Sequence, residues 1–131
     1  MRILVISDSH GNTRNIERAV ESQPEANIII HLGDGADDIV DLEFVYRDKQ
    51  FYQVAGNCDW GSSLPLEGEL KVADKTIFFV HGHEYKVKTN LQQIKMEAKK
   101  RNADIVLFGH THLPITEYDD ELYLLNPGSL Q

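Results

Sequence analysis

The sequence predicts an α/β fold in which several strands deliver polar residues to a common edge. Five short apolar runs each end in Gly, Asp, Asn or His, and such runs are typical of buried strands. In open α/β sheets, ligands bind just beyond the carboxyl ends of the strands. The five runs, each with the polar segment after it, are 3–6 with 7–10, 28–30 with 31–34, 51–54 with 55–59, 77–80 with 81–83, and 105–108 with 109–112.

The first half of the chain alternates strands with helices. A helix of about ten residues is expected after Thr13, because Ile16, Ala19 and Val20 would share one face, and it should end near Pro24. The predicted elements here are a strand over 2–7, that helix, a strand over 27–32, a short acidic helix over 37–46, a strand over 50–55 and a loop over 61–65.

The second half is expected to contain two hairpins, a helix and one further strand. Thr89 and Gln92 have the spacing of a capping box, which predicts a helix from there to about Arg101. The hairpins are predicted over 69–72 with 76–80 and over 114–118 with 121–125, and the single strand over 104–108. A chain of 131 residues is normally one domain, so we expect one domain over 1–131.

Composition and charge argue against several classes of protein. The apolar content of 41% and the charged content of 26% are ordinary for a globular protein. No apolar run approaches the roughly 18 residues of a membrane span. A net charge of −8 disfavours sequence-independent nucleic-acid binding, which depends on Lys and Arg. The N-terminus turns acidic at Asp8, too early for a signal peptide. A lone Cys58 cannot form an internal disulfide and favours a reducing, cytoplasmic location.

The polar residues at the strand ends have the chemistry of a polynuclear metal site. Asp8 and His10 are two residues apart, as are His110 and His112, so in an extended stretch the members of each pair share one face. Five strands that deliver such residues to one rim are therefore expected to hold metal ions there.

The other donors indicate which metals to expect. Asp34 follows Gly33 and offers a carboxylate that can bridge two cations, and Asn57 offers a neutral carbonyl oxygen. Imidazole with oxygen donors suits Mn, Fe, Ni or Zn better than Mg or Ca. The absence of a CxxC motif argues against a structural zinc site.

Each of these residues also has an ordinary structural explanation. A single Asp after a strand is usually a turn residue or a helix N-cap, and a single His there is usually packed or on the surface. Five of the six histidines lie at predicted strand ends, and this joint pattern favours the metal site. His31 lies inside its strand and is expected either to be structural or to support the residues that bind the metals. Only one of His81 and His83 need face the metals, and Cys58 is either an inert thiol or a thiol nucleophile.

Taken in order, these motifs resemble the calcineurin-like metallophosphoesterases, and among them the small bacterial and archaeal phosphodiesterases of the YfcE/MJ0936 type. The resemblance covers nearly the whole chain and implies a four-layer α/β/β/α sandwich. It rests on Asp8-x-His10, Gly33-Asp34, Gly56-Asn57-Cys58-Asp59, His81-Gly82-His83, Gly109-His110-Thr111-His112 and the closing Asn126-Pro127-Gly128-Ser129.

The resemblance further implies a metal-dependent phosphodiesterase that acts on small phosphodiesters. It implies two divalent ions, with Mn²⁺ the first expectation and Ni²⁺, Fe²⁺ or Zn²⁺ the alternatives. A hydroxide held between the ions would attack phosphorus in line. One ion would bind Asp8, His10, Asp34 and His112, and the other Asp34, Asn57, His81 and His110. The residues expected to act in catalysis are Asp34, Asn57, Cys58, His81 and His110.

Two features depart from the family pattern. Many relatives carry His where this chain has Cys58, and this difference weighs against efficient phosphomonoester hydrolysis. Relatives usually continue for about thirty residues past the Asn-Pro-Gly-Ser motif, so we expect a smaller second sheet or an exposed sheet edge, which favours association. A homo-oligomer that covers this edge is the corresponding expectation.

Two alternative functions stand beside the phosphodiesterase. One is a phosphomonoesterase or protein phosphatase of the same superfamily, which the short loops and Cys58 disfavour. The other is a non-catalytic scaffold resembling the retromer subunit, which the complete ligand set, including His10, disfavours. The expected partner is a small phosphodiester substrate, with no membrane and no stable nucleic-acid complex.

Overall fold

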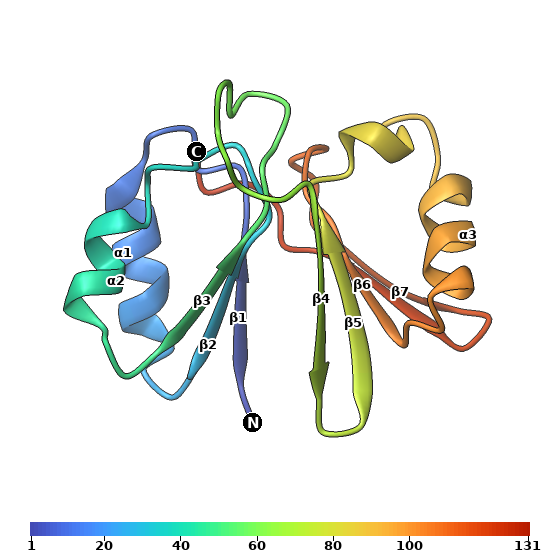
Figure 1. The fold of residues 1–131 in the computed structure, drawn as a ribbon, viewed down its shortest axis with the longest axis horizontal. Coiled ribbons are helices and arrows are strands. Elements are labelled where there is room, and N and C mark those ends of the chain that lie inside the picture. Colours follow the sequence, from blue (N-terminus) through green and yellow to red (C-terminus); the bar gives the residue numbers. More distant parts are fainter.

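Two β-sheets pack face to face between outer layers of helix (Figure 1). The computed structural model describes residues 1–131. Helices α1 (Thr13–Ser22) and α2 (Val40–Val45) cover the outer face of the first sheet, and α3 (Gln92–Lys100) covers the outer face of the second. The four-layer α/β/β/α sandwich expected from the resemblance is confirmed.

The first sheet is wholly parallel and has the strand order β1-β2-β3. Its strands are β1 (Ile3–Ile6), β2 (Ile28–His31) and β3 (Gln50–Gln53). Every residue of the central strand β2 is buried, because helices cover one face and the second sheet covers the other. The parallel arrangement brings the carboxyl ends of all three strands to one rim.

The second sheet is mixed and has the order β4-β5-β6-β8-β7. Its strands are β4 (Glu67–Val72), β5 (Lys75–Val80), β6 (Ile105–Leu107), β7 (Ile115–Asp119) and β8 (Leu122–Asn126). The antiparallel pairs β4–β5 and β7–β8 confirm both predicted hairpins. The middle strands β5, β6 and β8 run parallel, so β5 and β6 also end at a common rim.

Three apolar layers hold the sandwich together. Ile16 and Val20 of α1 pack on the first sheet, and Ile94 and Ala98 of α3 pack on the second. The layer between the sheets is built from buried residues of β2, β5 and β6 and includes Phe79. Full burial of one such large side chain stabilises the fold by about 1.5–3 kcal/mol. The rim carrying the polar residues therefore rests on a rigid base.

Two predicted helix boundaries are wrong. The expected Thr89–Gln92 capping box does not form: the N–H of Thr89 donates to the carbonyl of Lys86, which keeps Thr89 in a preceding turn. Helix α3 begins at Gln92, whose N–H donates a hydrogen bond to Asn90 Oδ1 at 3.0 Å. Helix α2 spans Val40–Val45 and is shorter than the predicted 37–46, because the N–H of Asp38 donates to the carbonyl of Gly35 in a turn.

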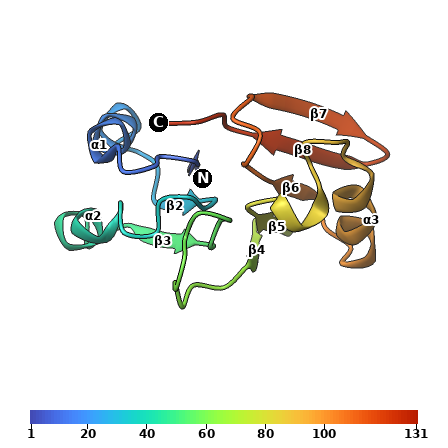
Figure 2. The ribbon, with the colours of Figure 1, turned by 90° about the horizontal axis from the view of Figure 1, so that it is seen from above.

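The end of the chain returns to the first sheet, where it lies near α1 and the N-terminal strand (Figure 2). The N–H of Leu130 donates to the carbonyl of Ser7 at 3.1 Å, and Ser129 Oγ donates to the carbonyl of Asp8 at 2.8 Å. Strands β1 and β3 remain the edges of the first sheet, and β4 and β7 those of the second. None of the helices has the length and apolar character needed to cross a membrane.

Candidate metal centre

The structure brings all seven predicted ligands to the rim where the two sheets meet. They come from the loops after β1, β2, β3, β5 and β6, which is why five separate stretches of sequence contribute. Three groups of residues each place their potential ligand atoms within 4.8 Å of one another. The first group is Asp8 with His10 and His112, the second is Asp34 with His81 and His110, and a third set, His10 with Asp34 and Cys58, links these two.

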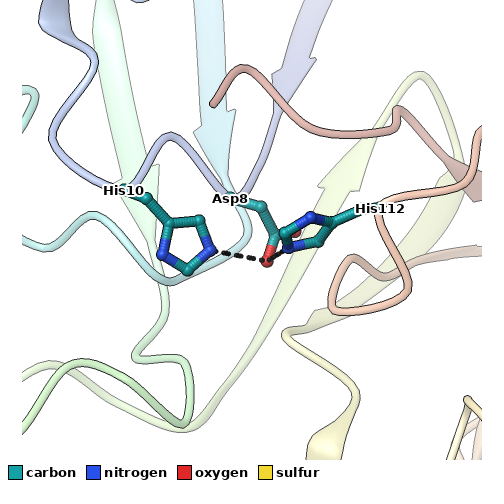
Figure 3. Close-up of side chains that lie close together, drawn as sticks. All are labelled: Asp8, His10 and His112. Atoms are coloured by element: carbon teal, nitrogen blue, oxygen red, sulfur yellow. Dashed lines mark ion pairs between the residues drawn. The ribbon is translucent and has the colours of Figure 1, made fainter.

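The first group joins the loop after β1, which carries Asp8 and His10, to the loop after β6, which carries His112 (Figure 3). Asp8 lies between two imidazoles, with its Oδ1 3.2 Å from Nε2 of His112 and 3.8 Å from Nε2 of His10. The two rings have centroids 5.3 Å apart. One carboxylate with two imidazoles around a common point is a donor set suited to a divalent transition metal.

The second group is built around His81, which is fully buried. Its Nε2 lies 3.3 Å from Oδ2 of Asp34, 3.2 Å from Nδ1 of His110 and 2.9 Å from Oδ1 of Asn57. The same Asp34 Oδ2 lies 3.7 Å from Nε2 of His10, a member of the first group. Asp34 thus stands between the two groups, where a bridging carboxylate would lie.

The environment of Asp8 shows that the site fits a cation. Its Oδ2 accepts hydrogen bonds from Ser7 Oγ at 2.5 Å and from the N–H of His110 at 3.0 Å. Its Oδ1 is buried and has no hydrogen-bond partner. Burying a charged oxygen without a partner is costly, and a divalent ion would remove that cost. The oxygens and imidazoles present here therefore suit a divalent transition metal.

The expectation that the i, i+2 pairs lie in extended stretches is wrong. Five of the seven predicted ligands have a positive φ, in the left-handed region that non-glycine residues seldom adopt. Each such residue costs about 1–3 kcal/mol, and such costs concentrate at functional sites. The five are Asp8 (53°), His10 (45°), Asp34 (61°), His110 (69°) and His112 (62°). Tight turns, rather than the pleat of a strand, aim these side chains.

The protonation of the second group follows from its packing. Burial alone would raise the pKa of the Asp34 carboxyl, but hydrogen bonds from His81 and from the N–H of Cys58 hold it well below its ordinary value. Burial alone would lower the pKa of His81, but Asp34 raises it above the ordinary value. Burial, with help from His81, lowers the pKa of His110 to about 4. The His110 ring is therefore neutral at pH 7, the form that can bind a metal ion.

Asp59 organises the site and was missed at the sequence level as a functional residue. Its Oδ2 accepts the backbone N–H of Asp34 at 2.8 Å and of Gly56 at 2.7 Å, and its Oδ1 accepts those of Gly35 and Ala36 at 3.0 Å. One carboxylate thus fixes the loop after β2 to the loop after β3. An Asp in a Gly-rich turn, where side chains commonly bond the backbone, is the signal that could have identified it.

The two remaining histidines have different environments. His31 is buried, as its predicted structural role requires: Nδ1 accepts the N–H of Gly33 at 3.1 Å, and Nε2 lies 2.9 Å from Ser9 Oγ. His83 has its ring centroid 5.4 Å from that of His81 and 6.2 Å from that of His110. It belongs to none of the three ligand groups, and its buried Nδ1 has no hydrogen-bond partner.

Cys58 is exposed and lies beside the bridging position. Its backbone N–H donates to Asp34 Oδ1 at 2.8 Å. Loss of surrounding water raises the pKa of its thiol, and the negative charges of Asp34 and Asp59 raise it further. A thiol nucleophile needs a lowered pKa, so the environment of Cys58 disfavours that alternative.

Two relatives align with essentially the whole chain. A probable metallophosphoesterase, YsnB of Bacillus subtilis (strain 168), is 32% identical over 133 residues, which cover 100% of this chain and 76% of the relative. The phosphodiesterase MJ0936 of Methanocaldococcus jannaschii is 28% identical over 144 residues, which cover 98% of this chain and 83% of the relative.

Solved structures share the fold. A conserved protein from Streptococcus pneumoniae TIGR4, described as a predicted phosphoesterase, superposes with a TM-score of 0.81 at 27% identity, over 97% of this chain and 71% of the other. Vacuolar Protein Sorting 29 from Cryptosporidium parvum superposes with a TM-score of 0.80 at 18% identity, over 97% of this chain and 73% of the other, and indicates a shared fold alone. Residues 1–131 also match the family model of the calcineurin-like phosphoesterase superfamily domain, and the protein belongs to that superfamily.

Proposed function

We propose that the protein is a dinuclear metal-dependent phosphodiesterase that hydrolyses small phosphodiesters. The observation that carries the proposal is the position of Asp34. Its Oδ2 lies 3.3 Å from His81 and 3.7 Å from His10, and so it faces both ligand groups at once. A relative named as a phosphodiesterase supports the same chemistry.

Each residue has a role in this proposal that follows from its position. Asp8, His10 and His112 would hold one ion, Asn57, His81 and His110 the other, and Asp34 both. When bound, two divalent ions lower the pKa of water and offset the charge that develops on the phosphoryl oxygens. Mn²⁺ suits this mixture of imidazole and oxygen donors, and Ni²⁺, Fe²⁺ and Zn²⁺ are the alternatives.

The surroundings of the centre favour a diester over a monoester. In this proposal Cys58 would lie beside the leaving group, where its raised pKa would make it a poor proton donor near neutral pH. Diesters with acidic leaving groups need little protonation. The complete ligand set also weighs against a purely structural scaffold, because buried charges and strained turns of this kind reduce stability without benefit to a scaffold.

The test is metal-dependent hydrolysis of bis-p-nitrophenyl phosphate, compared with p-nitrophenyl phosphate. After chelation, Mn²⁺, Ni²⁺, Fe²⁺ and Zn²⁺ are added back singly, and bound metal is counted by mass spectrometry. Asp34→Asn is expected to lower diester turnover by more than about 100-fold and to release both ions, since loss of a residue that merely supports a metal ligand already costs about 10–100-fold. His83→Ala should have a smaller effect.

A surface variant, Asp41→Asn on α2, serves as the matched control because it makes the same chemical change away from the centre. An Asp34→Asn protein that retains two tightly bound ions and normal turnover would show that the dinuclear assignment is wrong. A panel of phosphodiesters and cyclic nucleotides then narrows the substrate.

A further inference from the structure

An open cleft of about 670 Å³ leads away from the candidate metal centre. His10, Asp34 and Cys58 are among its lining residues, and so is Trp60. Trp60 is 91% exposed, although tryptophan is a large side chain that proteins normally cover. The indole therefore contributes little to the stability of the fold, while it offers a flat face beside the reaction site.

The backbone that carries Trp60 is fixed relative to the metal ligands. The preceding residue, Asp59, bonds through its carboxylate to the backbone of Asp34, Gly35 and Ala36. The carbonyl of Asp59 also accepts the N–H of Ser62 at 3.3 Å, which closes a turn around Trp60. Trp60 therefore directly follows the residue that fixes the loop after β2 to the loop after β3. The backbone of Trp60 is therefore positioned relative to the candidate metal ligands before a ligand arrives, as suits a binding residue.

The remainder of the cleft is acidic. Its lining includes Asp37, Asp38 and Asp59 and contains no Lys or Arg. Asp38 and Asp59 are occupied by hydrogen bonds, whereas exposed Asp37 makes no side-chain hydrogen bond or ion pair. A cleft with walls of one charge attracts groups of the opposite charge and repels further phosphates. An indole face beside carboxylates is the combination that binds ammonium groups.

We propose that this cleft binds the second ester group of the phosphodiester substrate, and that this group carries an ammonium. The ammonium lies on the indole face of Trp60, with Asp37 supplying the counter-charge. The proposal rests on the phosphodiesterase function above and names its substrate class: diesters in which one alcohol is cationic. Diesters whose second ester group carries additional phosphates are expected not to bind in this cleft.

The test uses two chromogenic diesters of nearly the same shape. One is p-nitrophenyl phosphorylcholine, and the other is its neutral 3,3-dimethylbutyl analogue, in which carbon replaces the quaternary nitrogen. We expect kcat/KM to be about fivefold to tenfold higher for the choline ester, chiefly through a lower KM, as cation–π contacts predict. Trp60→Ala should remove this preference, Trp60→Phe should retain part of it, and Asp37→Asn should reduce it.

Phe44→Ala provides the matched control, because Phe44 is an exposed aromatic of α2 outside the cleft. It should keep the full preference for the choline ester. Equal kcat/KM values for the two diesters, or an unchanged preference in Trp60→Ala, would overturn the proposal.

A second readout does not depend on turnover. Trp60 is the only tryptophan of the chain, so its fluorescence reports on this cleft alone. In the Mn²⁺-loaded protein, phosphocholine should change the emission at a lower concentration than 3,3-dimethylbutyl phosphate does. If this difference appears but no diester is hydrolysed, the cleft assignment stands and the phosphodiesterase proposal fails. If bis-p-nitrophenyl phosphate is hydrolysed but the two ligands act equally, the cleft assignment fails alone.

Discussion

Ser9 Oγ lies 2.9 Å from Nε2 of His31 and donates its own proton to Oδ2 of Asp38 at 2.6 Å. Because Nδ1 of His31 accepts the N–H of Gly33, the proton of the neutral ring is on Nε2, which donates to Ser9. The chain of bonds ties the loop after β1 to the end of β2 and to the turn before α2. It holds the backbone that presents the first metal ligands.

The buried His31 makes stability depend on pH. Burial lowers the pKa of His31 from its ordinary value of 6.5, although nearby carboxylates oppose this. The unfolded chain therefore binds the proton more readily, so the free energy of unfolding falls as pH drops below about 6.5 toward the folded-state pKa. In urea titrations of chelated protein at pH 7.5 and 5.5, the decrease should be smaller for His31→Gln than for the wild type. Equal decreases would contradict this role.

Gly56 provides a steric test of the bridging position. A Cβ at this position would overlap Oδ1 of Asp34 and come within 2.6 Å of its backbone N. Gly56→Ala should therefore displace Asp34 and weaken metal binding by more than about tenfold, as measured by calorimetry. Gly61→Ala is the matched control, since its Cβ would meet nothing within 4 Å and only its φ of +71° opposes the change. It should bind metal normally, with a modest loss of stability.

Cys58 is expected to limit substrates with poor leaving groups. Cys58→His should raise turnover of alkyl diesters more than turnover of aryl diesters, because an imidazole donates protons better near neutral pH. Cys58→Ala should keep much of the activity toward bis-p-nitrophenyl phosphate, since no covalent step is proposed. Complete loss of that activity in a folded, metal-loaded Cys58→Ala protein would revive the thiol nucleophile.

Metal removal should destabilise the whole fold. A ligand present at 100 times its Kd stabilises the folded state by about 2.7 kcal/mol, provided that it does not bind the unfolded chain. For a domain of this size, we expect chelation to lower the Tm by about 10 °C. Differential scanning calorimetry of Asp34→Asn should show almost no response to added Mn²⁺. If the Tm of the wild-type protein changed neither with chelator nor with added metal, metal binding at the rim would be contradicted.

Most of the fold could be predicted because its strands differ sharply in composition from the loops that succeed them. Apolar runs such as 28–30 and 77–80 end abruptly in His, Gly or Asp, so the strand positions could be located from local sequence. Helix starts were harder to locate. The interpretation of Thr89 as an N-cap failed because its N–H bonds to Lys86, a competition between two local patterns that the sequence alone does not resolve.

The donor residues of the site could also be predicted, but not how the chain aims them. The positive φ values of Asp8 and His110 depend on turns closed by distant partners, such as the bond from the N–H of Asp8 to the carbonyl of Gly33. Asp59 and Ser9 were missed for a related reason. The Gly-rich turn could mark Asp59 itself, but the groups that the Asp59 and Ser9 side chains bond are brought near only by the fold.

The bond between Ser129 and Asp8 joins residues 121 positions apart in the chain. A ribosome that adds about 5–20 residues per second needs roughly 6–24 seconds to make that intervening stretch. During this interval the nascent chain already contains Asp8 and His10, while His112 of the same group has still to be added. The first group of candidate ligands therefore cannot form before residue 112 has been made. A truncated product ending before residue 110 would carry Asp8, His10 and Asp34 but could not build either the first or the second ligand group in full.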